Sequence, residues 1–154
     1  MFHLAYVKPE HVGIKVAWKD VSRGMTAAVL PDSVDVNGRV VPLVPNQTLY
    51  SVDAVSLDEA YALSAVLNST IANALLLAVA ERAKDAHFRM FGRTVAQLPL
   101  PPLADAPALT RLARRAHAGR DADAEIDCAV AKLYGVSERE LAKLRRFVDH
   151  RLAR

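Results

Sequence analysis

The residues of this chain that are best suited to chemistry are scattered, and their spacing assembles no catalytic or metal site. The 5 histidines lie far apart, and the single cysteine, Cys128, can form neither an internal disulfide nor a zinc-ligand pattern. Asp58 and Glu59 are adjacent, but neighbours on a helix point in different directions, so we interpret them as charges at a helix N-terminus. Ser69 lacks the strand-turn-helix context of a nucleophile, and no glycine-rich phosphate loop is present. We therefore expect no catalytic residue and no metal ligand, and we expect Cys128 to be a small buried helix residue.

Positive charge is concentrated towards the C-terminus of the chain. The net charge is +3; residues 1–108 contain 9 Lys and Arg against 10 Asp and Glu, whereas residues 109–154 contain 11 against 7. A basic segment indicates an anionic partner such as nucleic acid. A solvated helix surface with mixed charges would produce the same excess, so charge alone leaves both interpretations open.

Length and composition are those of a globular protein. The chain has 154 residues, of which 52% are hydrophobic and 24% charged. It has no disulfide framework, and its N-terminus lacks a basic region followed by an apolar one. We therefore expect a cytoplasmic protein without a signal peptide.

The first part of the chain carries strand and turn signals. Residues 14–19 alternate in part between apolar and polar side chains, and residues 25–30 follow a Ser-Arg-Gly turn signal. Asn37-Gly38 is the strongest short hairpin signal, and another strand is predicted at residues 48–52. Pro42 cannot donate a backbone hydrogen bond, so its strand should lie at an edge or carry a bulge. These signals predict a small, mostly antiparallel sheet.

Helical signals begin at Ser56, where Ser-Leu-Asp-Glu fits a capping box. Residues 60–80 then form an uncharged run with helical spacing that is interrupted at Asn68-Ser69-Thr70. Asn tolerates a left-handed helix end and Ser caps a new helix, so two helices, or one bent helix, should meet there. The run is long enough to span a bilayer, but Asn68 and Asn73 near its middle would be costly in lipid. We expect core helices and no membrane partner.

The remaining segments predict a loop and then further helices. Residues 86–93 should form a loop, residues 94–97 a short helix, and the proline-rich residues 98–103 an extended segment. One helix should be capped by Asp105 and end at Gly119, a second should run from about Asp123 to Tyr134, and a third should begin after Ser137. The predicted fold is α+β: a small sheet packs on a central helix pair over residues 1–103. A basic helical subdomain follows over residues 104–154.

The order of these motifs resembles the C-terminal target-recognition region of adenine-specific (N6) DNA methyltransferases of restriction–modification systems. A strand region leading to a tyrosine-containing strand, a Leu-Asn-Ser helix end and a Leu-Pro-x-Pro exit are matched by Tyr50, Leu67-Asn68-Ser69 and Leu98-Pro99-Leu100-Pro101. The family's C-terminal helical pair is matched by Ile126-Asp127, Leu133-Tyr134-Gly135 and the acidic stretch from Ser137 to Glu140. The resemblance covers about residues 14–144.

This resemblance implies a DNA target-recognition module without catalytic activity. The family binds S-adenosylmethionine through a glycine-containing motif and extrudes adenine into an Asn/Asp-Pro-Pro-aromatic site, and this sequence contains neither motif. No cofactor is therefore expected in this chain, and S-adenosylmethionine is implied only for a separate catalytic domain. The implied partners are double-stranded DNA and an N6-adenine methyltransferase catalytic domain, in cis or in trans, of which this chain would be a fragment or a partner.

The resemblance places the DNA contacts in loops near the sheet edge and in the arginine-containing loop. The predicted DNA-binding residues are Lys19, Arg23, Asn37, Arg39, Arg89 and Arg93. Trp18 and Phe88 could stack on DNA, but burial in the core is the favoured interpretation. As an alternative, the helical tail is a protein-interaction module that docks a methyltransferase or restriction partner through arginine–carboxylate pairs.

Overall fold

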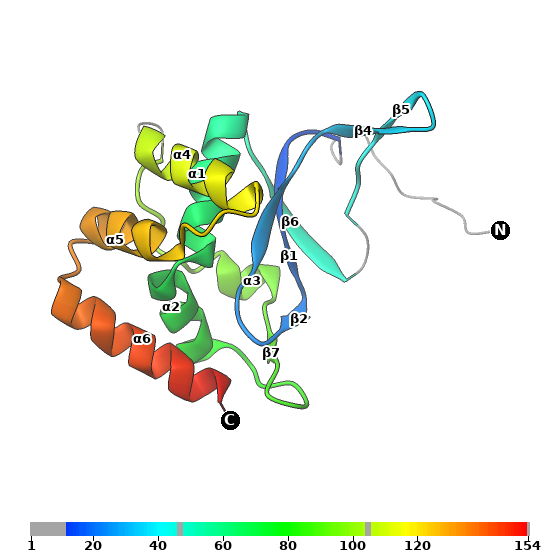
Figure 1. The fold of residues 1–154 in the computed structure, drawn as a ribbon. Coiled ribbons are helices and arrows are strands. Elements are labelled where there is room, and N and C mark those ends of the chain that lie inside the picture. Colours follow the sequence, from blue (N-terminus) through cyan, green and yellow to red (C-terminus); the bar gives the residue numbers. More distant parts are fainter. Residues whose placement is uncertain (1–11, 46–47, 104–105, 154) are drawn as a thin grey trace.

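The computed structural model describes residues 12–45, 48–103 and 106–153 and shows an α+β fold, as predicted (Figure 1). The strands are β1 (Lys15–Lys19), β2 (Val21–Ser22), β3 (Ala27–Leu30), β4 (Ser33–Val36), β5 (Arg39–Pro42), β6 (Leu49–Asp53) and β7 (Phe88–Arg89). The helices are α1 (Leu57–Asn68), α2 (Thr70–Val79), α3 (Gly92–Val95), α4 (Pro107–His117), α5 (Asp123–Tyr134) and α6 (Glu138–Leu152).

The strands are all paired antiparallel, but they form several small sheets where the sequence predicted one. A three-stranded sheet has the order β3-β1-β6, and two ribbons are formed by β2 with β7 and by β4 with β5. Pro31 directly follows β3 and has no N–H to donate, which ends the ladder there. Pro42 lies on β5, which among the described strands pairs with β4 alone, so its expected edge position is confirmed. β7 lies within the predicted loop; its 2 residues are too few to show strand periodicity.

The predicted hairpin turn between β4 and β5 is confirmed. Asn37 and Gly38 have φ of 54° and 79°, the left-handed pair that matches a hairpin to the twist of its strands. The N–H of Gly38 donates to Asp35 Oδ1 at 2.8 Å, which closes the turn.

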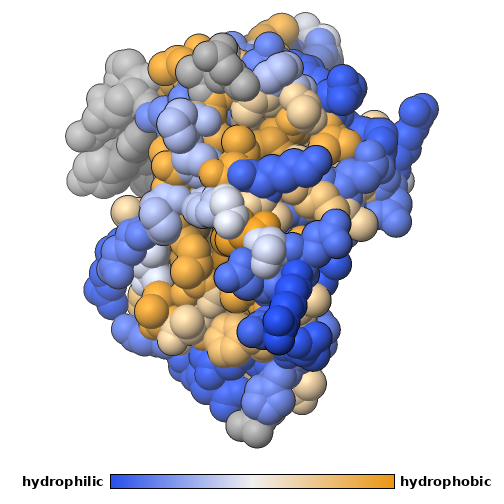
Figure 2. Space-filling view, turned by 90° about the vertical axis from the view of Figure 1, so that its left-hand side faces the viewer, coloured by the Kyte–Doolittle hydropathy of each residue, from blue (hydrophilic) through white to orange (hydrophobic). Residues whose placement is uncertain are grey.

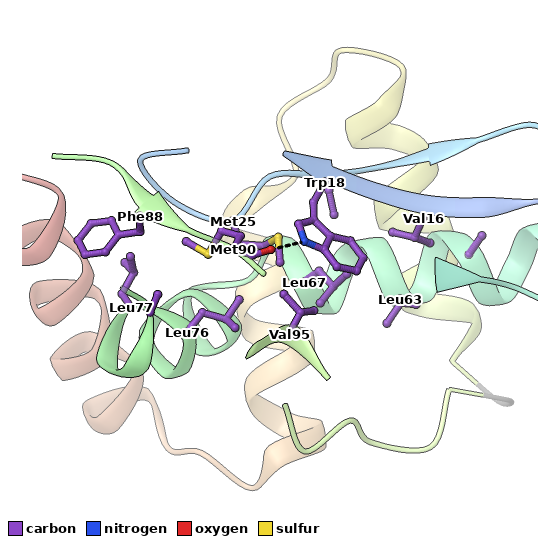
Figure 3. Packing of buried hydrophobic residues seen from close by; sticks show 13 residues of the cluster. Val16, Trp18, Met25, Leu63, Leu67, Leu76, Leu77, Phe88, Met90 and Val95 are labelled. Atoms are coloured by element: carbon purple, nitrogen blue, oxygen red, sulfur yellow. Dashed lines mark hydrogen bonds between the residues drawn. The ribbon is translucent and has the colours of Figure 1, made fainter. Parts of the chain in front are cut away.

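Helices α1 and α2 lie at the centre of the molecule, between the strands and the C-terminal helices (Figure 1). On the strand side, a core cluster contains Val16, Trp18 and Leu67; on the other side, α1 and α2 pack against α4, α5 and α6. Figure 3 shows the first cluster, in which the indole Nε1 of Trp18 donates to the carbonyl oxygen of Met90 at 2.8 Å. Trp18 and Phe88 are 5% and 0% exposed, which confirms that both belong to the core.

The two predicted capping boxes differ in detail. The capping box that begins at Ser137 is complete: the Ser137 hydroxyl accepts from Glu140 N at 3.3 Å, and the Glu140 carboxylate accepts from Ser137 N at 2.9 Å. Ser56 likewise accepts from Glu59 N at 3.1 Å. The Glu59 carboxylate, however, accepts from Val55 N rather than from Ser56 N, because the extended chain before α1 brings the Val55 N–H within 2.7 Å.

The other helix boundaries follow the predictions closely, with two exceptions. The short helix α3 begins at Gly92, two residues before the predicted start, and Asp105 lies outside the described residues. Cys128 is exposed, so the prediction of a buried cysteine is wrong. On α5 the buried face is formed by Ile126, Asp127, Val130 and Ala131, and the side chain of Cys128 points away from it.

Among the described residues, no single helix is both long and apolar enough to cross a bilayer. Helices α1 and α2 reach that length only together, and they are bent by 60° at their junction.

Candidate nucleic-acid interface

The bend between α1 and α2 is fixed by side-chain hydrogen bonds. Ser69 has extended backbone angles and caps α2 by accepting from Ala72 N at 3.2 Å, as predicted. Asn68 is the last residue of α1 and is not left-handed; among the described residues other than glycine, positive φ occurs at Asn37, Asp85 and Ala86. The predicted left-handed helix end is therefore wrong, because the Asn68 side chain serves a different purpose.

That purpose is to hold the segment that leads into β3. Asn68 Oδ1 accepts from Ala27 N at 2.7 Å and its Nδ2 donates to Ala27 O at 2.9 Å, as a neighbouring strand would. Asn73 Oδ1 accepts from Met25 N at 2.8 Å. A Cβ at Gly24 would lie 2.9 Å from Asn73 Oδ1, so any larger residue here would displace the Asn73 amide from its bond to Met25. The loop between β2 and β3 is thus fixed to the central helices.

Further along β3, the same edge is held by a histidine. His117, the last residue of α4, accepts from Val29 N through Nε2 at 3.0 Å. Its Nδ1 lies 2.9 Å from Ala113 O, so Nδ1 carries the proton in this arrangement. Tyr61 contacts the imidazole edge-on at 5.1 Å between ring centroids.

A buried carboxylate completes the junction from the side of the C-terminal helices. Asp127 is 8% exposed, and it accepts from Thr70 N and from Thr70 Oγ1, both at 2.7 Å. Arg145 of α6 donates to the same carboxylate at 3.1 and 3.2 Å. The negative charge lies at the positive N-terminal end of α2, which favours it. A cavity of about 340 Å³ opens beside Asn68, Asn73 and Asp127, but the polar atoms of these side chains are already bonded within the protein. We interpret the junction as structural.

The β2–β7 ribbon gathers four of the predicted DNA-binding residues at one end of the molecule. Val21 pairs with Arg89 and Ser22 with Phe88, and Met90 N donates to Asp20 O at 2.7 Å. Four exposed cationic side chains come to lie on or next to the ribbon as a result. Arg89 is on β7, Arg23 directly follows β2, Lys19 ends β1, and Arg93 is on α3. We call these four the ribbon cations.

Aromatic rings position several arginines at this end. The guanidinium carbons of Arg89 and Arg93 lie 5.7 and 4.7 Å from the ring centroid of Phe91. Arg82 and Arg151 lie 5.7 and 4.9 Å from the ring centroid of Phe88. Such contacts hold a guanidinium in place while leaving its N–H groups free to donate. Arg93 also pairs with Glu81 at 3.3 Å, but both side chains are exposed, so the pair is worth ~1 kcal/mol or less.

The sequence did not indicate Arg82 or Arg151 as part of this group. Arg151 reaches it from the end of α6, and its Nη2 donates to Leu77 O at 2.6 Å. Arg23 in turn donates through Nη2 to Leu152 O at 3.0 Å. The Arg23 bond joins the ribbon to α6 across 129 positions of the sequence, and the Arg151 bond joins α6 to α2 across 74, so no local pattern could have revealed them.

Asn37 and Arg39 are not brought together with the ribbon cations. Both are exposed at the tip of the β4–β5 ribbon, which projects away from the helices and from the β2–β7 ribbon (Figure 1). Asn37 also forms the turn itself. The predicted DNA-binding residues therefore fall into two separate groups.

Shifts in pKa occur on the C-terminal helices, away from the ribbon. The hydrogen bond and charge of Arg115 lower the pKa of the Glu125 carboxyl, and the same bond raises the pKa of Arg115. Partial burial raises the pKa of Tyr134. Hydrogen bonds from the side chain and backbone of Ser137 lower the pKa of Glu140. The shifts of Arg115, Glu125 and Glu140 belong to a helix–helix pair and a helix cap, and that of Tyr134 reflects burial alone.

Comparisons with protein-family models, with curated proteins and with solved structures find no match to the chain. Across residues 12–45, 48–103 and 106–153, no three His, Cys, Asp or Glu side chains gather into a group that could hold a metal ion. A functional interpretation therefore depends on the sequence motifs together with the geometry of the ribbon.

Proposed function

We propose that the chain is a non-catalytic DNA target-recognition module, similar in role to the C-terminal part of a restriction–modification N6-adenine DNA methyltransferase. The observation that carries the proposal is the set of ribbon cations, two of which are held on the face of Phe91. A guanidinium fixed at an exposed position suits phosphate oxygens and the edge of guanine, because both accept two parallel hydrogen bonds.

The two separate groups of predicted residues have different roles in this proposal. Arg89 and Arg93 contact the duplex at the β2–β7 ribbon, and Lys19 and Arg23 contact phosphates beside them. Asn37 and Arg39 reach a second position on the DNA from the tip of the β4–β5 ribbon. A methyltransferase catalytic domain in the cytoplasm, in cis or in trans, supplies S-adenosylmethionine and the pocket for the extruded adenine.

Fluorescence anisotropy with a labelled duplex at low salt tests this function. Replacing both ribbon arginines, Arg89→Ala with Arg93→Ala, should weaken binding by about tenfold or more, since each removes a charge-assisted contact. The matched control is Arg111→Ala with Arg120→Ala, which removes the same charge from exposed positions on and after α4. The proposal fails if the native chain does not bind at tens of micromolar, or if the ribbon variant binds as tightly as the control.

A groove on the C-terminal helices favours the alternative function, a protein-interaction module that docks a methyltransferase or restriction partner. It has a volume of about 480 Å³, lies between α4 and α5, and is lined in part by Leu109, Leu112 and the exposed Leu133. Figure 2 views this side of the molecule and shows apolar side chains surrounded by hydrophilic ones. Capture of a methyltransferase subunit that persists at high salt, by a chain that binds no DNA, would support this alternative.

A further inference from the structure

Helix α6 carries a row of cationic and imidazole side chains on the face that points away from the protein. Arg139, Lys143, Arg146 and His150 follow one another at alternating intervals of four and three residues, which places them along one side of a helix. All four are exposed. The opposite side of α6 packs on the core through a stripe of apolar residues, Leu141, Leu144, Val148 and Leu152.

The three cations of this row make no ion pair within the described part of the chain, whereas several other arginines of the C-terminal helices are paired. Arg114, Arg115 and Arg145 are paired with Asp58, Glu125 and Asp127. The acidic residues of α6 offset the row only in part: hydrogen bonds from Ser137, and then the nearby charge of Lys143, lower the pKa of Glu140, and Glu138 belongs to the first turn of the helix. Asp149 lies at the edge of the row, three residues after Arg146.

The dimensions of the row suit a line of phosphates. At about 1.5 Å per residue, the row from Arg139 to His150 is about 16 Å long. A strand of B-DNA advances ~3.4 Å per phosphate along the duplex axis and farther along its winding backbone, so a row of this length reaches about three neighbouring phosphates. Its C-terminal end reaches the β2–β7 ribbon, because Arg23 bonds to Leu152 O and Arg151 covers the ring of Phe88.

We propose that Arg139, Lys143, Arg146 and His150 form a sequence-independent contact to the DNA backbone that extends the site of the ribbon cations along α6. This inference rests on the proposed function, since it assigns a second part of the same DNA-binding surface. A DNA backbone is favoured over an acidic protein surface because the row is regular and carries one exposed large apolar side chain at its edge, Phe147, where a protein partner would bury a larger apolar patch.

The test compares two variants of equal net charge. The row variant is Arg139→Gln, Lys143→Gln and Arg146→Gln, and the control variant is Arg111→Gln, Arg120→Gln and Lys132→Gln, at exposed positions outside α6. Affinity is measured by anisotropy against two duplexes of unrelated sequence over a range of salt concentrations. The row variant should bind both duplexes about tenfold or more weakly, and its salt slope should fall by about 2 to 3, since each lost phosphate contact removes ~0.9. Asp149→Asn should strengthen binding to both duplexes.

Helical content by circular dichroism should be unchanged in both variants, because Gln is a good helix former. The inference is overturned if the control variant loses as much affinity and slope as the row variant. The inference is also overturned if the row variant keeps the salt slope of the native chain while the double variant Arg89→Ala with Arg93→Ala abolishes DNA binding. In that case the proposed function stands, but α6 takes no part in it. If the row variant loses its slope and the ribbon variant binds normally, the row is supported and the ribbon is not the recognition site. A native chain that binds no DNA, but does bind an acidic protein, overturns both.

Discussion

The α1–α2 junction and the β2–β7 ribbon both place polar side chains at the ends of short elements, but they use them differently. At the junction, Asn68, Asn73 and Asp127 bond to backbone groups and side chains of the protein itself. At the ribbon, Arg89 makes no side-chain hydrogen bond to any described residue, and Arg93 reaches only the exposed Glu81. Polar groups that are fully bonded within the protein, of which Asn73 and Asp127 are also buried, specify a fold. Polar groups that are held in place and left unbonded are available to a partner.

The largest effect predicted by this comparison is on stability at the junction. Asp127→Ala should lower the free energy of unfolding by about 2–3 kcal/mol, because it removes the charged acceptor of the Thr70 N–H and hydroxyl and leaves the exposed Arg145 without its partner. Urea denaturation followed by circular dichroism measures this loss. Asp149→Ala, which removes an exposed carboxylate, serves as the control and should change stability little. A loss below about 1 kcal/mol in Asp127→Ala would mean that the junction is not a structural centre.

A smaller loss of unfolding free energy is expected at Asn68, the junction residue that holds the start of strand β3. Asn68→Ala removes both bonds to Ala27 and should cost about 2 kcal/mol of unfolding free energy. Hydrogen exchange should show the Ala27 amide losing its protection first. Thr26→Ala, at an exposed neighbouring position, is the matched control. Unchanged protection at Ala27 would contradict the assigned role of Asn68.

At the ribbon, the comparison predicts an effect on binding with little effect on stability. Phe91→Leu keeps both arginines but removes the ring that holds them, which is worth about 0.5–1 kcal/mol for each contact at an exposed site. DNA affinity should fall by about threefold to tenfold, while the salt slope stays the same because no charge is lost. Anisotropy titrations measure both quantities, with Leu133→Ala at an exposed apolar position on α5 as the control. A changed salt slope would show that the ring does more than position the arginines.

The smallest effect concerns the cap of α6. Because Ser137 lowers the pKa of Glu140 in the folded state, ionised Glu140 stabilises the fold above its unfolded pKa, and this contribution is lost as the pH falls through the lowered value. The stability difference between the native chain and Glu140→Gln should therefore be present at about pH 7 and shrink towards about pH 3. Urea midpoints at several pH values measure it. A difference that grows on acidification would have the wrong sign for this cap.

The elements that could be predicted from the sequence are those with local signals. Asn37-Gly38 and Ser137 specify a turn and a helix start from a few neighbouring residues, and both are confirmed. The contacts of Asn68 and Arg151 join residues that are 41 and 74 positions apart, so no local pattern contains them. Cys128 was assigned to the core by residue type, whereas its position on α5 relative to Ile126 and Val130 determines its exposure. The grouping of the ribbon cations likewise depends on the pairing of β2 with β7.

The hydrogen bonds that Asn68 and His117 make to β3 have a consequence for assembly. The strand β3 is an outer strand of its sheet, and an outer strand normally offers its backbone as a template to other chains. Here the N–H groups of Ala27 and Val29 are both occupied, by side chains that come from two helices. A second molecule therefore finds no free donor at these two positions, which removes them as a template for pairing with another strand.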